Sequence, residues 1–106
     1  MTILALDACG RYAIAALKRG DETLYAVSDG GVGAVRAVYS SVDRVLAHAG
    51  IGAIEIDAIV VNTGPGSWTG VRVSATYTAG LAFAAGKRVY GYSGFSIGKH
   101  LGGVTF

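Results

Sequence analysis

The sequence is poor in cysteine and in charged side chains, and each shortage excludes a class of protein. Its single cysteine, Cys9, cannot form an internal disulfide, and together with His48 and His100 it supplies too few ligands for a structural zinc site. We therefore expect no metal site. Charged residues make up 15% of the chain, the net charge is +2, and no run of Lys or Arg is long enough to follow a phosphate backbone. Nucleic-acid binding by this chain alone is not expected.

The chain also lacks the segments that direct proteins into membranes. Its first residues, MTILALDACG, have no basic start and carry Asp7 where a signal peptide is apolar. The best apolar stretch, residues 71–85, is too short to span a bilayer and contains Arg72. A chain of 106 residues has room for a single domain. We expect one cytoplasmic domain that does not contact membranes.

Apolar residues are abundant in this short chain. They make up 52% of the sequence and give a mean hydropathy of +0.48. The charged fraction is well below the roughly 25% of ordinary soluble domains. This balance indicates that some apolar surface contacts a partner.

The order of periodic segments predicts a fold of the α/β class. Alternating and short apolar runs indicate strands, and apolar residues three and four apart indicate helices. The expected elements are strands at 2–6, 11–18, 22–28, 56–61 and 88–92, helices at 35–49 and 68–85, and a short helix beginning near Ser93. Three meandering strands followed by helix-connected strands are typical of a ribonuclease-H-like lobe. We expect a mixed five-stranded sheet flanked by helices, with the first, fourth and fifth strands parallel.

The sequence GPGSWTG at 64–70 lies between a predicted buried strand and a predicted helix. Its glycines permit unusual backbone conformations and close approach, and Ser67 or Thr69 can cap the helix. The loop lacks the Lys of a P-loop and the glycine spacing of a dinucleotide fingerprint or a nucleophile elbow. Two interpretations remain open, a structural turn and a weak contact to phosphate or to a partner. Their candidate residues are Asp7, Gly64, Gly66, Ser67, Thr69, Gly70 and Arg72.

Asp7, at the end of the first strand, occupies a position that often holds a metal-binding carboxylate in this fold. The second carboxylate of a two-metal site would be Asp57, but it begins a strand that runs parallel to the first. The two carboxylates are then expected on the order of 15 Å apart, too far to share metal ions. Asp7 is therefore either a phosphate-facing group or a residue that caps a turn.

The helix at 68–85 is expected to be apolar on both sides. A sheet-facing side is predicted from Val71, Ala75, Thr78, Ala82 and Ala85. The opposite side carries no charge, whereas a surface helix usually has charges there. We predict that this side is an association surface formed by Val73, Thr76, Tyr77, Gly80, Phe83 and Ala84. The alternative is a helix of small residues that exposes a few apolar atoms to water.

Three segments resemble the TsaB (formerly YeaZ) family of glycoprotease-like proteins. They are ILALDA at 3–8, IDAIVVNTGPGSWTGVRV at 56–73 and VYGYS at 89–93. The most specific part is the GPGS-aromatic-TG-aliphatic-R string, and the resemblance spans nearly the whole chain in the expected order. It implies the N-terminal lobe of an ASKHA (actin-like ATPase) fold, with the family's second lobe absent from residues 1–106.

The resemblance also implies a function. Members of this family are non-catalytic scaffolds in the synthesis of threonylcarbamoyladenosine in tRNA, and they need no cofactor of their own. The implied partners are a second copy or the catalytic paralogue TsaD, with the ATPase TsaE assisting and tRNA reached only through the complex. The histidine found near the start of the first helix in relatives has no counterpart at 33–36.

A rival interpretation is a small nucleotide-binding or phosphotransfer lobe of the ASKHA type. It would use Asp7 and the loop at 64–70. ASKHA proteins hold nucleotide between two lobes, so a single lobe leaves most of that surface in water. A peptidase is not expected, because the sequence offers no nucleophile with a base and no zinc ligands.

Overall fold

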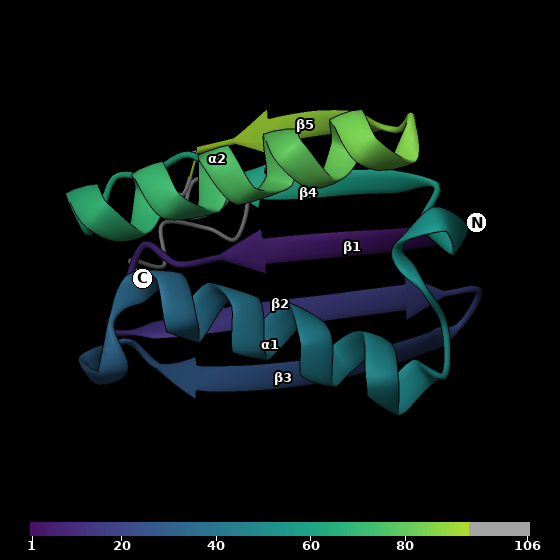
Figure 1. Ribbon diagram of the computed structural model, residues 1–106, viewed down its shortest axis with the longest axis horizontal. Helices are drawn as coiled ribbons and strands as arrows, with labels where there is room; N and C mark the ends of the chain where they lie inside the picture. The colour runs from purple at the N-terminus through teal and green to yellow at the C-terminus, as the bar shows by residue number, and fades with distance from the viewer. Residues whose placement is uncertain (94–106) are drawn as a thin grey trace, which may run out of the picture.

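The computed structural model describes residues 1–93, which form one sheet with two helices beside it (Figure 1). The elements in chain order are β1 (Thr2–Asp7), β2 (Tyr12–Arg19), β3 (Glu22–Asp29), α1 (Ala34–Ala49), β4 (Ala58–Asn62), α2 (Trp68–Ala85) and β5 (Arg88–Tyr92). Two short 3-10 turns, Gly30–Val32 and Ala53–Glu55, precede α1 and β4. The short helix that the sequence predicts after Ser93 lies outside the described residues.

The sheet has the order β3-β2-β1-β4-β5. Strands β1, β2 and β3 pair antiparallel as a meander, and β4 and β5 continue the sheet parallel to β1. This topology confirms the predicted ribonuclease-H-like lobe. Because β1 and β4 are parallel neighbours, their carboxyl ends lie side by side, and the loops that follow them meet at one edge of the sheet.

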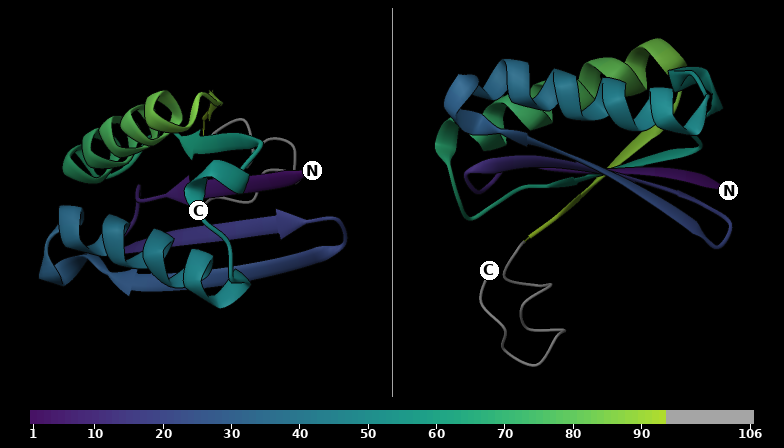
Figure 2. Two further views of the ribbon diagram at one scale, coloured as in Figure 1. Left: turned by 45° about the vertical axis from the view of Figure 1, so that its right-hand side comes forward. Right: turned by 90° about the horizontal axis from the view of Figure 1, so that it is seen from below.

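Both helices lie on the same face of the sheet (Figure 2). The described residues therefore have a single layer of two helices beside the predicted mixed five-stranded sheet. The connections β3-α1-β4 and β4-α2-β5 each join parallel strands and step in the same direction across the sheet. Right-handed crossovers that step in one direction place their helices on one face.

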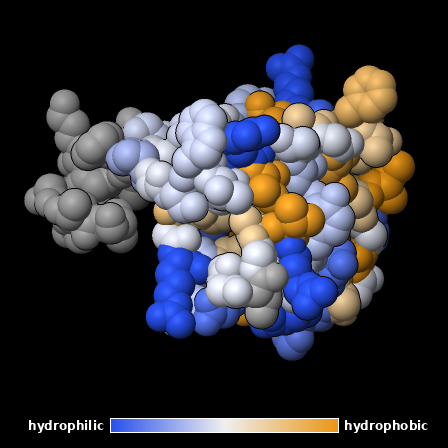
Figure 3. Space-filling model, turned by 60° about the vertical axis from the view of Figure 1, so that its left-hand side comes forward, coloured by the Kyte–Doolittle hydropathy of each residue, from blue (hydrophilic) through white to orange (hydrophobic). Residues whose placement is uncertain are grey.

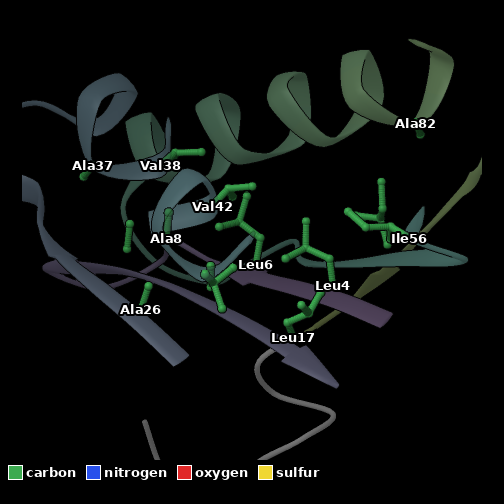
Figure 4. Packing of buried hydrophobic residues seen from close by; sticks show 14 residues of the cluster. Leu4, Leu6, Ala8, Leu17, Ala26, Ala37, Val38, Val42, Ile56 and Ala82 are labelled. Carbon is green, nitrogen blue, oxygen red and sulfur yellow. The ribbon is translucent and has the colours of Figure 1, made fainter. Parts of the chain in front are cut away.

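The core fills the space between the sheet and the two helices (Figure 4). Its fully buried side chains include Leu4 and Leu6 of β1, Ile59 of β4 and Val42 of α1. Burying an aliphatic side chain of this size contributes about 1.5–3 kcal/mol relative to leaving it in water. Strand β1 is therefore the centre of the lobe, and it fixes where the loops at its carboxyl end lie.

The buried side of α2 differs in detail from the predicted one. Ala75 is exposed, whereas Ser74 and Thr78 are fully buried. Their hydroxyls donate hydrogen bonds to the carbonyls of Val71 and Ser74, at 3.1 and 2.8 Å, so their burial leaves no polar group unsatisfied. Thr78 lies on the predicted sheet-facing side, whereas the apolar pattern did not identify Ser74.

Candidate functional site

The loop after β4 packs tightly against the end of β1. A Cβ atom on Gly66 would overlap the Cys9 carbonyl oxygen and lie 2.6 Å from the Cys9 Cβ. A Cβ on Gly70, in the first turn of α2, would overlap the Ala8 carbonyl oxygen. The Ser67 amide donates to the Cys9 carbonyl across 2.7 Å. Only glycine fits at 66 and 70, because the backbone of the two residues after β1, Ala8 and Cys9, occupies the space of a side chain.

Two further residues of this loop have a local structural role. Gly64 has φ = 107°, a value that side chains disfavour. The Ser67 hydroxyl accepts a hydrogen bond from the Gly70 amide at 3.2 Å, and this makes Ser67 the N-cap of α2. Four residues of the predicted loop motif, Gly64, Gly66, Ser67 and Gly70, therefore shape the backbone.

Asp7 joins the carboxyl ends of β1 and β4. One carboxylate oxygen accepts the Cys9 amide at 2.9 Å, and the other accepts the Asn62 side-chain amide at 3.0 Å. Asn62 in turn accepts the Gly64 amide at 3.0 Å, and its side chain is 7% exposed. Sequence reasoning missed Asn62. The available signal was a polar residue directly after the buried run of β4.

The other carboxylate that the sequence offered lies at the opposite end of these strands. Asp57 accepts the Thr2 amide at 2.7 Å, while Asp7 ends β1. Within residues 1–93 no group of three His, Cys, Asp or Glu side chains is arranged to hold a metal ion. The arrangement around Asp7 thus provides turn capping, and it does not bring two carboxylates together.

Burial raises the pKa values of two side chains that interact with Asp7, those of Cys9 and Tyr92. It raises the pKa of the Cys9 thiol to about 11, and the charge of Asp7 adds to the effect. Burial also raises the pKa of Tyr92 to about 12, again with a contribution from Asp7. A thiol with a raised pKa is protonated and unreactive at neutral pH. Cys9 is therefore a small packing residue at this site.

A hollow lies beside the loop, between the turn after β1 and the start of α1. It is lined by Cys9, Gly10, Gly31, Ser67 and other residues, and the exposed Arg11–Asp29 ion pair of 3.3 Å borders it. The Gly31 amide and then the Arg11 guanidinium bond to Asp29 and lower the pKa of its carboxyl group. Asp7 does not line this hollow. The hydrogen bonds of Asp7 and of Ser67 stabilise the lobe itself.

Thr69 and Arg72 face a different surface, the outer side of the helical layer. Both line a groove of about 490 Å³ that runs between α1 and α2. The Arg72 guanidinium lies 5.9 Å from the centre of the exposed Trp68 ring. The seven residues of the loop motif therefore divide between the packed loop and this groove.

The groove is apolar along most of its length. From α2 it is lined by Val73, Thr76, Tyr77, Gly80 and Leu81, and from α1 by Val35 and Tyr39. The rings of Tyr39 and Tyr77 lie with centroids 4.7 Å apart at an interplanar angle of 48°, which fits a favourable tilted pair. Burial raises the pKa of Tyr77. The contribution of α1 was not identified from the sequence, although Val35 and Tyr39 are spaced one helical turn apart.

The predicted association surface of α2 is largely open to water. Thr76, Gly80 and Ala84 are exposed, and Phe83 is 90% exposed. Val73 and Tyr77 are half-buried because they also pack against the core. Hydrophobic residues gather on the helical side of the molecule, at the right of Figure 3. A contiguous apolar surface of this kind is unusual in a monomer and is typical of an interface.

Residues 1–93 contain no helix that is both long and apolar enough to cross a membrane.

Comparison with known proteins shows what the chain is similar to. Residues 34–96 match the model of a family described as TsaD, tRNA N6-adenosine threonylcarbamoyltransferase. The chain is 38% identical over 89 residues to the tRNA threonylcarbamoyladenosine biosynthesis protein TsaB of Haemophilus influenzae. This match covers 80% of the chain and 36% of that protein.

Solved structures support the same relationship. YeaZ from Pseudomonas aeruginosa superposes with a TM-score of 0.83 at 31% identity, over 91% of this chain and 45% of that one. A second structure from the same organism is titled as an uncharacterized protein with similarity to peptidase YEAZ. It superposes with a TM-score of 0.82 at 33% identity, over 91% of this chain and 44% of that one. RuvC of Thermus thermophilus shares the fold alone. It superposes with a TM-score of 0.55 at 16% identity, over 97% of this chain and 70% of that one. The chain thus spans less than half the length of the TsaB and YeaZ relatives.

Proposed function

The chain belongs to the TsaB (YeaZ) family, and from this premise we propose that it is a non-catalytic scaffold subunit in the synthesis of threonylcarbamoyladenosine in tRNA. The similarity to TsaB, a protein named for that biosynthesis, supports the pathway. The observation that carries the scaffold role is the exposed apolar groove between α1 and α2.

The groove fits a helix of a partner. Gly80 leaves its centre open, since a Cβ there would have no neighbour within 4 Å. Glycine in a helix interior costs up to about 1 kcal/mol relative to alanine, a cost that close approach of a second helix can offset. Phe83 and Trp68, which are 90% and 73% exposed, are aromatic side chains of the kind that anchor interfaces.

The partner is a second copy of the chain or a TsaD-like paralogue. A match between residues 34–96 and the TsaD family supports a paralogous partner, because two homologous lobes can pair about a pseudo-two-fold axis as two copies pair about a true one. In this assembly the paralogue performs the transfer, a TsaE-like ATPase assists, and tRNA contacts the chain only through the complex.

The residues around Asp7 support a scaffold rather than an enzyme. Both carboxylate oxygens of Asp7 are engaged by Cys9 and Asn62, and Asp57 lies at the other end of the strands. The helix-capping and close-packing roles of Ser67, Gly66 and Gly70 likewise need no substrate.

Reconstitution with a TsaD-like paralogue, tRNA and the threonylcarbamoyl donor tests this function. We expect modified adenosine in the tRNA when the chain and the paralogue are both present, and none when the chain is the only protein. Gly80→Arg should reduce the yield strongly, whereas Ala75→Arg, an exposed position of α2 outside the groove lining, should not. Modification by the chain alone, or equal yields with and without it, would contradict the proposal.

A further inference from the structure

The groove between α1 and α2 is apolar along most of its length but basic at one end. Both helices begin at that end (Figure 1), where Arg72 lines the groove together with Thr69 and Val35. Arg36 lines an adjoining hollow that shares Thr69 and Val35 with the groove. Both arginines are exposed, so a partner that lies in the groove passes two cations at this end.

The positive charge at this end of the groove has no compensating carboxylate in the chain. Neither Arg36 nor Arg72 forms an ion pair within residues 1–93. The Trp68 ring near the Arg72 guanidinium supplies no opposite charge. The two helices contain three arginines and a single acidic residue, Asp43, and α2 has no acidic residue. The helical layer therefore presents uncompensated positive charge beside its apolar groove.

The two arginines also lie at the less favourable ends of their helices. The start of a helix favours Asp and Glu over Arg, because its backbone amides carry partial positive charge. Arg36 lies in the first turn of α1, Arg72 lies just after the first turn of α2, and neither first turn contains an acidic residue. A carboxylate from outside the chain would compensate this charge.

A second copy of the chain supplies such a carboxylate poorly. In a two-fold dimer the same surface serves both subunits, so the helical layer of one copy faces that of the other. Two layers of this composition bring arginines together, and Asp43 is the sole acidic residue that the helices of either layer offer. Like charges that face each other across an interface oppose association. The charge beside the groove therefore favours a different chain.

We propose that the groove binds a helix of a different chain, apolar on the side that enters the groove and bearing Asp or Glu where it passes Arg72 and Arg36. The apolar contact supplies affinity, and the carboxylates fix the direction of the bound helix and discriminate against a second copy. This proposal rests on the proposed function, in which the groove is the association surface.

Cross-linking with a carbodiimide tests the pairing directly, because this reagent joins an amine to a carboxylate in contact with it and leaves arginine unreacted. Arg72→Lys keeps the charge and introduces an amine, and Arg88→Lys, at an exposed position of β5, is its control. In a mixture with a TsaD-like paralogue, Arg72→Lys should gain a cross-link to an Asp or Glu of that protein, identified by mass spectrometry, and the control should not. The absence of this cross-link, or a cross-link only to Asp43 of a second copy, would overturn the proposal.

Charge reversal provides a second measurement. Combining Arg36→Glu with Arg72→Glu should weaken association with the paralogue at least about tenfold in sedimentation, because two attractions become repulsions. Combining Lys18→Glu with Arg88→Glu changes the net charge equally at exposed strand positions and should have little effect. Raising the salt concentration from about 0.05 M to about 0.5 M should narrow the difference between the unaltered chain and the first variant.

The same experiment separates the charge pairing from the scaffold role. An association constant unchanged by the reversal of Arg36 and Arg72, while Gly80→Arg still weakens association, would overturn the pairing and leave the scaffold role intact. Association unchanged by Gly80→Arg as well would overturn both. Circular dichroism verifies that each variant is folded.

Discussion

Gly70 in the first turn of α2 lies directly over the carbonyl oxygen of Ala8, the residue that follows β1, with no room for a side chain between them. The contact places the start of α2 against the central strand, so it sets the position of the helical layer. The same helix contains Gly80, which has open space in place of such a neighbour. Two glycines ten residues apart thus serve opposite purposes.

Gly70→Ala should therefore destabilise the lobe by about 1–3 kcal/mol, because the added methyl forces α2 away from β1. Gly80→Ala is the matched control, and it should raise the free energy of unfolding by up to about 1 kcal/mol through helix propensity. Urea denaturation followed by circular dichroism measures both. Similar stability of the two variants would show that the close approach at Gly70 is unimportant.

Ser67→Ala should lower the free energy of unfolding by about 1 kcal/mol, since the Gly70 amide loses its capping acceptor. Thr69→Ala, an exposed position two residues after Ser67, should change stability much less. The same denaturation experiment compares the two. If both variants lose equal stability, Ser67 does not act as the cap.

Stability should fall at alkaline pH because of Cys9. Folding raises the pKa of its thiol from 9.0 to about 11, so the folded state retains a proton that the unfolded state loses in this window. The free energy of unfolding therefore declines as the pH rises from 9.0 to about 11. Tyr92, whose pKa rises from 10.0 to about 12, extends the decline upward.

Urea midpoints measured at about pH 8 and about pH 10.5 detect this effect. The decrease between them should be smaller for Cys9→Ala than for the unaltered chain. The same decrease in both proteins would mean that the thiol does not contribute.

The chain should have no useful nucleotide site. Calorimetry with ATP and magnesium is expected to show no binding tighter than about 1 mM, near −4 kcal/mol. Asp7→Asn should lower stability, because the carboxylate accepts the Cys9 and Asn62 hydrogen bonds. Micromolar ATP binding that Asp7→Asn abolishes would favour the phosphotransfer interpretation over the scaffold.

Much of the fold follows from sequence periodicity and from local end signals. The helix predicted at 68–85 has these bounds in the structure, because Ser67 caps its start and Gly86, with φ = 67°, ends it. The first helix likewise ends before Gly50, with φ = 70°. Periodicity identifies the buried side of an element and says nothing of the face of the sheet on which a helix lies. The shared face follows from the strand order together with crossover handedness.

The candidate site was only partly accessible to the same reasoning. The outer side of α2 is visible as a helix without charges, so Thr76, Gly80 and Phe83 could be identified in advance. The pairing of Tyr39 with Tyr77 depends on how α1 and α2 pack together, and no single helix encodes that arrangement. The hydrogen bond between Asp7 and Asn62 depends on the register of β1 and β4, which alternation alone does not fix.

The most direct test of the scaffold account is the association constant of Gly80→Arg, measured by sedimentation with the chain alone and with a TsaD-like paralogue. Arginine at this open position favours the helix but places a long cation in the groove, where contact with a partner would bury its charge. The account predicts a variant that is folded by circular dichroism and associates at least about tenfold more weakly, while Ala75→Arg associates as the unaltered chain does. Equal association constants for Gly80→Arg and the unaltered chain, or unfolding of Gly80→Arg, would contradict it.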